Sequence, residues 1–386
     1  NQDKTKRMKR VTLKLTTLVM LLGGAITVSN AQSTKINVVT SAVPFLRISP
    51  DIRGAGMGDV GIATTADANS GYANIAKIPF STSQAGFGAS YTPWLRDLGI
   101  SDVYVAALNG FYKLDEESAI SGSLRYFSLG SIEFTNSIGD PQGSYRPREM
   151  AIDAGYSRKL SAKNSIGLAI RYISSNLAGT VNNVTYKKAS AVAGDLHFFH
   201  NGAKENGEGF SWGVALSNLG SKISYTSDAN QKDYIPANFG IGGAYTKVFD
   251  EDNKMTFALD LNKLMVPTPG DTTPGALNKY RTQSVVSSWF KSFGDAPDGI
   301  SEEIQEVTAS LGLEYWYNNQ FAFRAGYFYE NPTKGNRKFL SVGAGLKYNV
   351  FGLNFAYIFP SGNGSTRNPL SNTYRFGLVF DFDGSK

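Results

Sequence analysis

The fold is decided by residues 306–330, which read EVTASLGLEYWYNNQFAFRAGYFYE. Two runs flank the pair Asn318-Asn319. In each run every second residue is apolar or aromatic, and mostly small, polar or charged residues stand between them. Strand side chains alternate between two faces, so this pattern predicts a β-hairpin with one apolar, aromatic face. In a soluble sandwich that face packs on a second sheet, whereas in a membrane barrel it faces lipid and the polar face lines the interior.

Similar alternating runs fill the chain from Ser83 to its C-terminal end. Each is long enough for a tilted membrane span of roughly 9–11 residues, and there are about fourteen of them. The predicted runs are 83–93, 102–114, 119–134, 149–160, 165–176, 188–199, 209–219, 236–248, 254–263, 306–317, 320–330, 338–348, 351–359 and 372–382.

The connections between these runs alternate between short and long, which is typical of outer-membrane barrels with a periplasmic short side. The even number of strands therefore predicts that both chain termini are periplasmic. Charged residues gather on the face predicted to point inward, as expected because charge facing lipid costs roughly 2–4 kcal/mol at the bilayer midplane. They are Arg125, Asp153, Arg171, Asp195, Asp260, Glu314, Arg324 and Arg375. We predict an all-β fold, a transmembrane antiparallel β-barrel of about 14 strands.

Composition agrees with many short strands and limits the chemistry. Glycine accounts for 41 residues, and tyrosine and phenylalanine for 20 and 24, which favours tight turns and aromatic belts over helices. The mean hydropathy of -0.22 does not argue against a barrel, because alternation hides the apolar surface. The chain has no cysteine, so disulfides and thiol chemistry are excluded. The net charge of +6 lies partly in the N-terminal residues and does not indicate nucleic-acid binding.

The N-terminal 31 residues have the pattern of a secretory signal peptide. Basic Lys9, Arg10 and Lys14 precede the apolar run Leu15–Ile26, and small residues at Ser29 and Ala31 suit cleavage after Ala31. The run is shorter than the roughly 18–20 residues of a spanning helix. An uncleaved anchor is the alternative. We assign 1–31 to the signal peptide with upstream residues, and expect an exported protein.

Residues 32–82 lack sustained alternation, and we predict that they form an N-terminal hatch inside the barrel of residues 83–386. Residues 56–61 within this stretch, GMGDVG, also match the G-x-G-x-x-G dinucleotide pattern. That interpretation needs a preceding strand and an acidic residue about 20 positions on, and neither is present. We expect these glycines to allow tight turns and close packing.

The connection 264–305 is the longest and is predicted to be extracellular. Within it, residues 284–293 have helical apolar spacing. The candidate partner-binding residues are Val285, Val286, Trp289, Phe290 and Phe293. Two alternatives stay open: the apolar face docks a partner or an apolar ligand, or the helix folds onto its own barrel mouth.

No catalytic, cofactor or metal site is predicted, and we expect no enzyme activity. The histidines His197 and His200 lack further ligands nearby. Asp195 and His197 share the inner face, so a hydrolase with Ser211 or Ser217 is one hypothesis, and a hydrogen-bonded network in the lumen is the other.

Two motifs carry a resemblance to a known family. The stretch Arg53–Asp59 followed by Asn74-Ile75-Ala76 resembles the hatch of FadL-like outer-membrane proteins, in which the second motif reads Asn-Pro-Ala. The hatch residues carried over are Arg53, Gly54, Gly56, Met57, Gly58, Asp59, Asn74 and Ala76. Within that family the layout is most similar to the PorV (LptO) family of the Bacteroidetes type IX secretion system.

The resemblance implies partners and no cofactor. PorV-like proteins bind a SprA-type translocon barrel and the C-terminal domains of secreted cargo, and they pass the cargo to a surface attachment complex. Outer-membrane lipid surrounds their barrel. Two alternative functions follow from the same resemblance. One is a FadL-like transporter of small hydrophobic molecules, and the other is a lipopolysaccharide O-deacylase.

Overall fold

The computed structural model describes residues 37–177, 180–181, 184–185, 187–225, 232–268, 280–359, 361 and 372–383. The predicted signal peptide and residues 32–36 lie outside this described part. Within it, no helix is long and apolar enough to cross a membrane.

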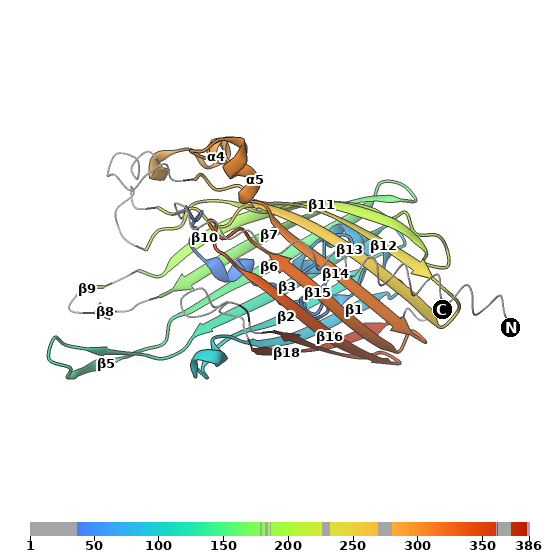
Figure 1. Ribbon diagram of the computed structural model, residues 1–386, viewed down its shortest axis with the longest axis horizontal. Helices are drawn as coiled ribbons and strands as arrows, with labels where there is room; N and C mark the ends of the chain where they lie inside the picture. Colours follow the sequence, from blue (N-terminus) through green and yellow to red (C-terminus); the bar gives the residue numbers. More distant parts are fainter. Residues whose placement is uncertain are drawn as a thin grey trace, which may run out of the picture. The chain divides into compact units, whose positions relative to one another are not determined.

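The described residues form a closed antiparallel barrel of fourteen strands, in which β1 pairs with β18 (Figure 1). The strands are β1 (Ala85–Pro93), β2 (Val103–Lys113), β3 (Ser118–Leu129), β6 (Arg148–Lys159), β7 (Asn164–Asn176), β10 (Ala189–His200), β11 (Gly209–Gly220), β12 (Asn238–Val248), β13 (Asn253–Leu264), β14 (Thr308–Tyr317), β15 (Phe321–Tyr329), β16 (Lys338–Tyr348), β17 (Phe351–Ile358) and β18 (Thr373–Phe382). The predicted fold class is confirmed.

The hairpin of residues 306–330 forms as expected. Strands β14 and β15 pair with Glu314 opposite Arg324. Asn318 and Asn319 both have a φ of 52°, the left-handed conformation that asparagine tolerates in tight hairpin turns. Alternation assigns the two faces correctly: all eight charged residues predicted to point inward are buried.

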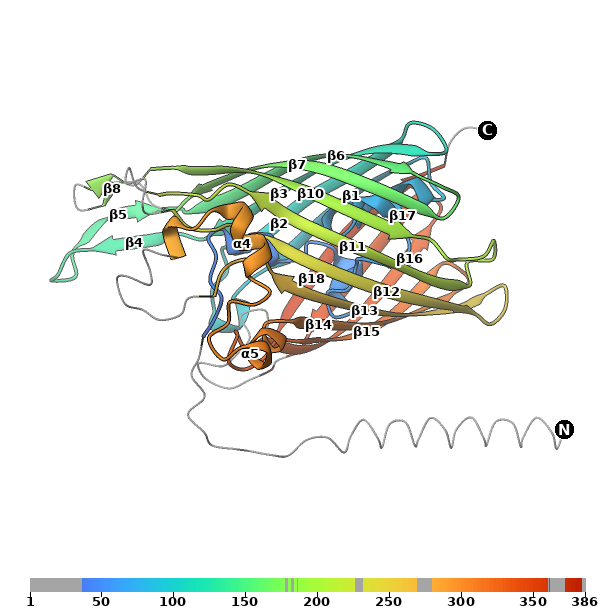
Figure 2. The same ribbon diagram turned by 90° about the horizontal axis from the view of Figure 1, so that it is seen from above.

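The long connections gather at one end of the barrel and the short turns at the other (Figure 2). Two of them carry small hairpins, β4 (Ile132–Thr135) with β5 (Pro141–Tyr145) and β8 (Thr180–Val181) with β9 (Val184–Thr185). The predicted strand 119–134 therefore ends early, at Leu129, where Gly130 takes a φ of 80°. The connection after β13 carries α4 (Val285–Lys291) and α5 (Ile300–Gln305). Between β1 and β2 lies the short helix η4 (Arg96–Leu98).

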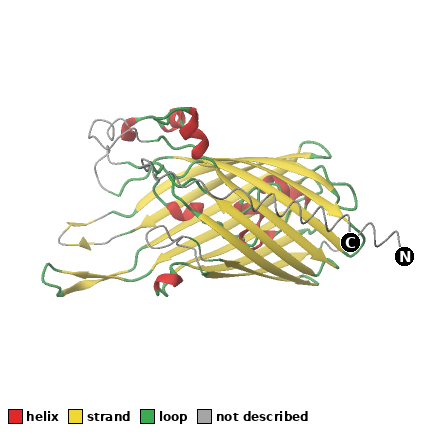
Figure 3. Ribbon diagram, in the orientation of Figure 1, coloured by secondary structure: helices red, strands yellow, loops and turns green. Residues whose placement is uncertain are grey.

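Residues 37–84, here called the inner segment, precede β1 and contact the inner side of the barrel wall. They contain four short helices: η1 (Pro44–Arg47), α2 (Ile52–Ala55), η2 (Ala68–Tyr72) and η3 (Ile75–Phe80). Figure 3 shows short helices of this segment among the strands. The segment starts at the long-connection end, where the Asn37 amide donates to the Thr333 carbonyl at 3.0 Å. It finishes at the short-turn end, where the Gln84 amide donates to Phe382 at 2.9 Å.

Candidate functional site

Arg53 ties the inner segment to the barrel wall. Helix α2 begins at its cap Asp51, whose carboxylate accepts the Arg53 amide at 2.9 Å. The Arg53 guanidinium then donates from Nε and Nη2 to the two carboxylate oxygens of Glu314 on β14, at 2.9 and 2.7 Å. It also meets Asp67 Oδ2 at 3.1 Å. Such a two-point contact fixes orientation as well as charge.

Glu314 has a second arginine partner on the neighbouring strand. Arg324 Nε donates to Glu314 Oε2 at 2.8 Å, and Arg324 Nη1 donates to Asn354 Oδ1 at 2.9 Å. Glu314 and Arg324 are 1 % and 4 % exposed. One buried carboxylate therefore holds two guanidinium groups, one from the wall and one from the inner segment.

The glycines of the first motif allow backbone to touch backbone. Gly58 has a φ of 72°, and its amide donates to Ser341 Oγ at 2.9 Å. A Cβ on the wall residue Gly326 would lie 2.0 Å from the Gly58 nitrogen. A Cβ on Gly56 would lie 3.0 Å from the Gly343 Cα. This glycine cluster is used in packing against the wall, which leaves the dinucleotide hypothesis without a free phosphate cradle.

The second motif caps helix η3. Asn74 is fully buried and accepts the Ala76 amide at 3.0 Å. Its Nδ2 donates to the carbonyls of Ile62 and Phe198, at 3.0 and 3.1 Å. Isoleucine stands at 75, where the related motif has proline, and its amide donates to His197 Nδ1 at 3.1 Å. Proline has no amide hydrogen, so this bond depends on the departure from the motif.

His197 is placed in a network and does not form a catalytic triad. Because Nδ1 accepts from the Ile75 amide, the neutral ring carries its proton on Nε2, which lies 3.4 Å from Ser217 Oγ. A triad needs an aspartate on Nδ1 and a free Nε2 that accepts the serine proton. Asp195 instead binds Arg171 at 2.9 Å and the Asn218 amide at 2.7 Å. The geometry removes the candidate base of the hydrolase hypothesis.

A cavity of about 220 Å³ lies between the inner segment and the barrel wall. Trp94, Phe328 and Phe339 give it an apolar side. Its arginines have protein partners. They are Arg47 (Glu330), Arg125 (Leu46 carbonyl), Arg171 (Asp153 and Asp195) and Arg337 (Glu330).

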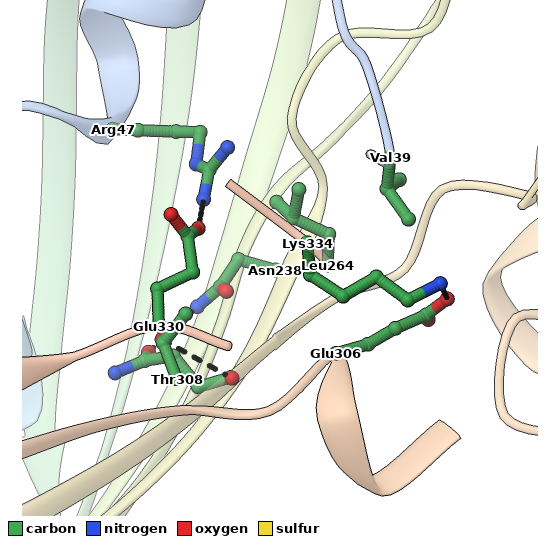
Figure 4. Close-up of a pocket in the computed structure, with 9 residues that line it drawn as sticks. Val39, Arg47, Asn238, Leu264, Glu306, Thr308, Glu330 and Lys334 are labelled. Atoms are coloured by element: carbon green, nitrogen blue, oxygen red, sulfur yellow. Dashed lines mark hydrogen bonds and ion pairs between the residues drawn. The ribbon is translucent and has the colours of Figure 1, made fainter. Parts of the chain in front are cut away.

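A smaller cavity of about 30 Å³ adjoins it, with room for roughly one water molecule. In Figure 4, Arg47 meets Glu330 and Lys334 meets Glu306 at this place. Burial and the nearby charge of Arg337 lower the pKa of Arg47 to about 10.

Helix α5 is held down by its carboxylates. Glu303 and Glu306 bind Lys263 at the end of β13, and Glu302 and Glu306 bind Lys334 after β15. Burial opposes the charge of Glu302, but the hydrogen bonds from Lys334, the Asp298 amide and Asn37, together with the charge of Lys334, outweigh it, so the pKa of Glu302 lies below its usual value. The apolar side chains of α5 point the other way: Ile300 and Ile304 are 81 % and 68 % exposed.

Helix α4 occupies the predicted position but leaves several apolar residues of this stretch exposed. Ser288 and Ser292 are fully buried, whereas Val286, Phe290 and Phe293 are 56, 76 and 49 % exposed. Val285 packs toward Tyr234 and Val266 at the barrel mouth, Phe293 makes an edge contact with Phe239, and Trp289 is half-buried. One side of the helix packs on the barrel mouth, as the second sequence alternative expects, and the other side is exposed, so docking of a partner stays a prediction. We call Val286, Phe290, Phe293, Ile300 and Ile304 the outer apolar face.

Comparison with known families gives one match: residues 30–271 match the family described as "Type IX secretion system protein PorV". The chain belongs to the PorV family. The match covers the inner segment and most of the barrel wall and ends before α4, so the outer apolar face lies beyond it. No curated protein matches the sequence.

Solved structures similar to this PorV-family chain are FadL-like outer-membrane barrels. The Ralstonia pickettii toluene transporter TbuX has a TM-score of 0.52 at 10 % identity, over 87 % of this chain and 98 % of its own. A Pseudomonas aeruginosa FadL homologue gives 0.48 at 11 % identity, over 87 % and 99 %. The P. putida toluene transporter TodX gives 0.48 at 12 % identity, over 86 % and 98 %. At these identities the likeness concerns the fold alone. The match to the PorV family model confirms the resemblance stated from the sequence, and the protein is an outer-membrane barrel.

Proposed function

We propose that this protein is an outer-membrane component of the type IX secretion system that binds the SprA-type translocon and the C-terminal signal of secreted cargo. It then carries the cargo to the surface attachment complex. The family match supports membership of the secretion system, and the outer apolar face is the observation that carries the docking role. Exposed apolar patches on soluble parts of a protein mark interaction sites.

In this proposal the short turns are periplasmic and the long connections extracellular, as in other outer-membrane barrels. The inner segment acts as a hatch that keeps the lumen closed. Its buried ion network and glycine contacts favour a static plug, so cargo recognition is assigned to the outer loops and not to the lumen.

The test is affinity purification from outer membranes extracted in mild detergent. Wild-type protein is expected to recover the translocon barrel and cargo domains. The triple variant V286S/F290S/F293S should insert normally and lose them. Recovery of both partners by the triple variant would refute the assignment of docking to this face, and failure of the wild-type protein to recover either would refute the function itself.

A FadL-like transporter of small hydrophobic molecules is the second candidate. The observation that favours it is the cavity of about 220 Å³ with its side of Trp94, Phe328 and Phe339. It requires the hatch to open. Uptake of a radiolabelled monoaromatic compound by vesicles containing the protein, above that of empty vesicles, would favour this candidate.

A further inference from the structure

The first described residues do not lie at the end of the barrel where the first strand begins. Residues 37–42, here called the strap, contact three different long connections. The Asn37 amide donates to the Thr333 carbonyl at 3.0 Å, and the Ala42 amide donates to the Tyr234 carbonyl at 2.8 Å. The Tyr280 hydroxyl donates to the Thr40 carbonyl at 3.2 Å. The strap therefore joins the connections β11–β12, β13–β14 and β15–β16.

The strap also supports α5 and the base of α4. Asn37 Nδ2 donates to Glu302 Oε1 at 2.9 Å, the same carboxylate oxygen that Lys334 binds. Val39 is 7 % exposed and packs with Tyr234 and Val266, against which Val285 of α4 also packs. The strap thus contacts the supports of both helices that carry the outer apolar face, α4 and α5.

From the strap the chain runs through the lumen to the opposite end. Arg47 binds Glu330 near the mouth, and Arg53 binds Glu314 within the wall. Further along, Phe80 contacts Phe199, and Lys113 Nζ donates to the Ser81 carbonyl at 3.3 Å, both at the short-turn end. The inner segment consequently crosses the barrel once before β1 begins.

We propose that the strap lies on the cell-surface side of the outer membrane and acts as a latch that holds α4 and α5 in position. The side of the membrane follows from the orientation in the proposed function. The latch itself depends only on the contacts given above. The sequence predicts that both chain termini are periplasmic; in this proposal the C-terminal strand ends at the periplasmic short turns, whereas the first described residues lie at the long connections.

Single cysteines test the topology without background, because the chain has no cysteine of its own. Thr40→Cys is the probe. Thr40 is exposed, and it accepts the Tyr280 hydrogen bond through its backbone carbonyl, which the substitution keeps. Ile138→Cys, 81 % exposed between β4 and β5, marks the long-connection side. Asp252→Cys, exposed in the turn between β12 and β13, marks the short-turn side. A membrane-impermeant maleimide is applied to intact cells and to lysed cells.

Labelling of Thr40→Cys together with Ile138→Cys in intact cells, with Asp252→Cys labelled after lysis, is the expected result. Labelling of Thr40→Cys only after lysis or unfolding, while Ile138→Cys is labelled in intact cells, overturns the proposal. If Asp252→Cys is the position reached from outside and Thr40→Cys behaves like Ile138→Cys, the orientation in the proposed function fails, and with it the cell-surface location.

The latch is tested separately on the purified full chain. Asn37→Asp places a carboxylate beside Glu302, whereas Thr40→Asp adds the same charge to an exposed strap position. Limited proteolysis between α4 and α5, at the exposed residues 297–299, should be several-fold faster for N37D than for T40D or wild type. Equal cleavage rates for N37D and T40D would overturn the latch.

Discussion

The inner segment and the connection that carries α4 and α5 both interrupt the strand pattern, but they bury opposite kinds of side chain. The inner segment buries its charges: Arg53 is 8 % exposed and paired. The connection buries Ser288 of α4 and the glutamates of α5 and leaves Phe290 and Ile300 outside. A polar group goes inside where its partners are provided, and an apolar group stays outside where a partner molecule can cover it. This contrast supports the proposal that the inner segment closes the barrel and that the connection serves recognition.

The largest effect is expected from Glu314→Gln. Removing one member of a buried ion network leaves Arg324 without a carboxylate and Arg53 with Asp67 alone, at a cost of about 3–5 kcal/mol. Urea unfolding of the reconstituted barrel, followed by tryptophan fluorescence, measures the free energy of unfolding. Glu116→Gln, whose side chain is 90 % exposed, is the matched control and should change it little. Equal midpoints for the two variants would show that the inner segment is not held by this carboxylate.

Gly326→Ala should have the next largest effect. The added Cβ meets the backbone of Met57 and Gly58, which cannot move aside as a flexible side chain can. Overpacking of this kind costs about 1–3 kcal/mol. Gly122→Ala on β3 is the control, because its Cβ would find only the Asp153 carbonyl, at 3.5 Å. If the two variants unfold at the same urea concentration, the close backbone contact does not stabilise the inner segment against the wall.

Acid should loosen the connection while the wall remains folded. A carboxylate whose pKa is lowered by folding stabilises the fold above its unfolded pKa, and this stabilisation is lost as the pH falls through the folded pKa. Glu302 belongs to this class, with an ordinary pKa of 4.5. Asp295 acts in the opposite sense, because burial raises its pKa to about 6.

Hydrogen exchange, corrected for intrinsic pH dependence, checks this directly. Exchange of the amides of residues 285–305, relative to those of β14, should fall slightly as the pH drops through 6 and rise below 4.5. A monotonic change in the relative exchange would mean that Asp295 and Glu302 do not act in opposite directions.

The smallest effect on stability is expected from Phe290→Ala. Its side chain is 76 % exposed, and exposed substitutions usually change the free energy of unfolding by less than about 0.5 kcal/mol. The same urea experiment measures it. A loss above 1.4 kcal/mol, a factor of about ten in the unfolding equilibrium, would mean that Phe290 serves the fold and not a partner.

The contrast between the two regions explains which features the sequence could predict. Alternation in 306–330 defines which residues face inward, so the burial of Glu314 and Arg324 was predictable from period two. The pairing of Glu314 with Arg53 could not be predicted from the sequence. These residues are 261 positions apart, and alternation does not tell which part of the wall an inner segment contacts. The hydrogen bond from the Ile75 amide to His197 could not be predicted either, because alternation does not tell which wall residue the inner segment contacts.

The helix in the long connection was predictable from its apolar spacing, but its exposed side was not. Apolar periodicity normally marks the buried face. The buried positions are Ser288 in α4 and Ser292 at its C-cap, so the usual inference points to the wrong side. The two exposed isoleucines of α5 were missed because six residues are too few to show a period.

Site-specific photo-crosslinking tests the division between closure and recognition most directly. A photoreactive phenylalanine analogue is placed at Phe290 on the outer apolar face or at Phe328 beside the lumen cavity, in cells with an active secretion system. Crosslinked products are identified by mass spectrometry. We expect adducts with the translocon barrel or with cargo C-terminal domains from Phe290 and none with these proteins from Phe328. Adducts with cargo from Phe328 and none from Phe290 would contradict it.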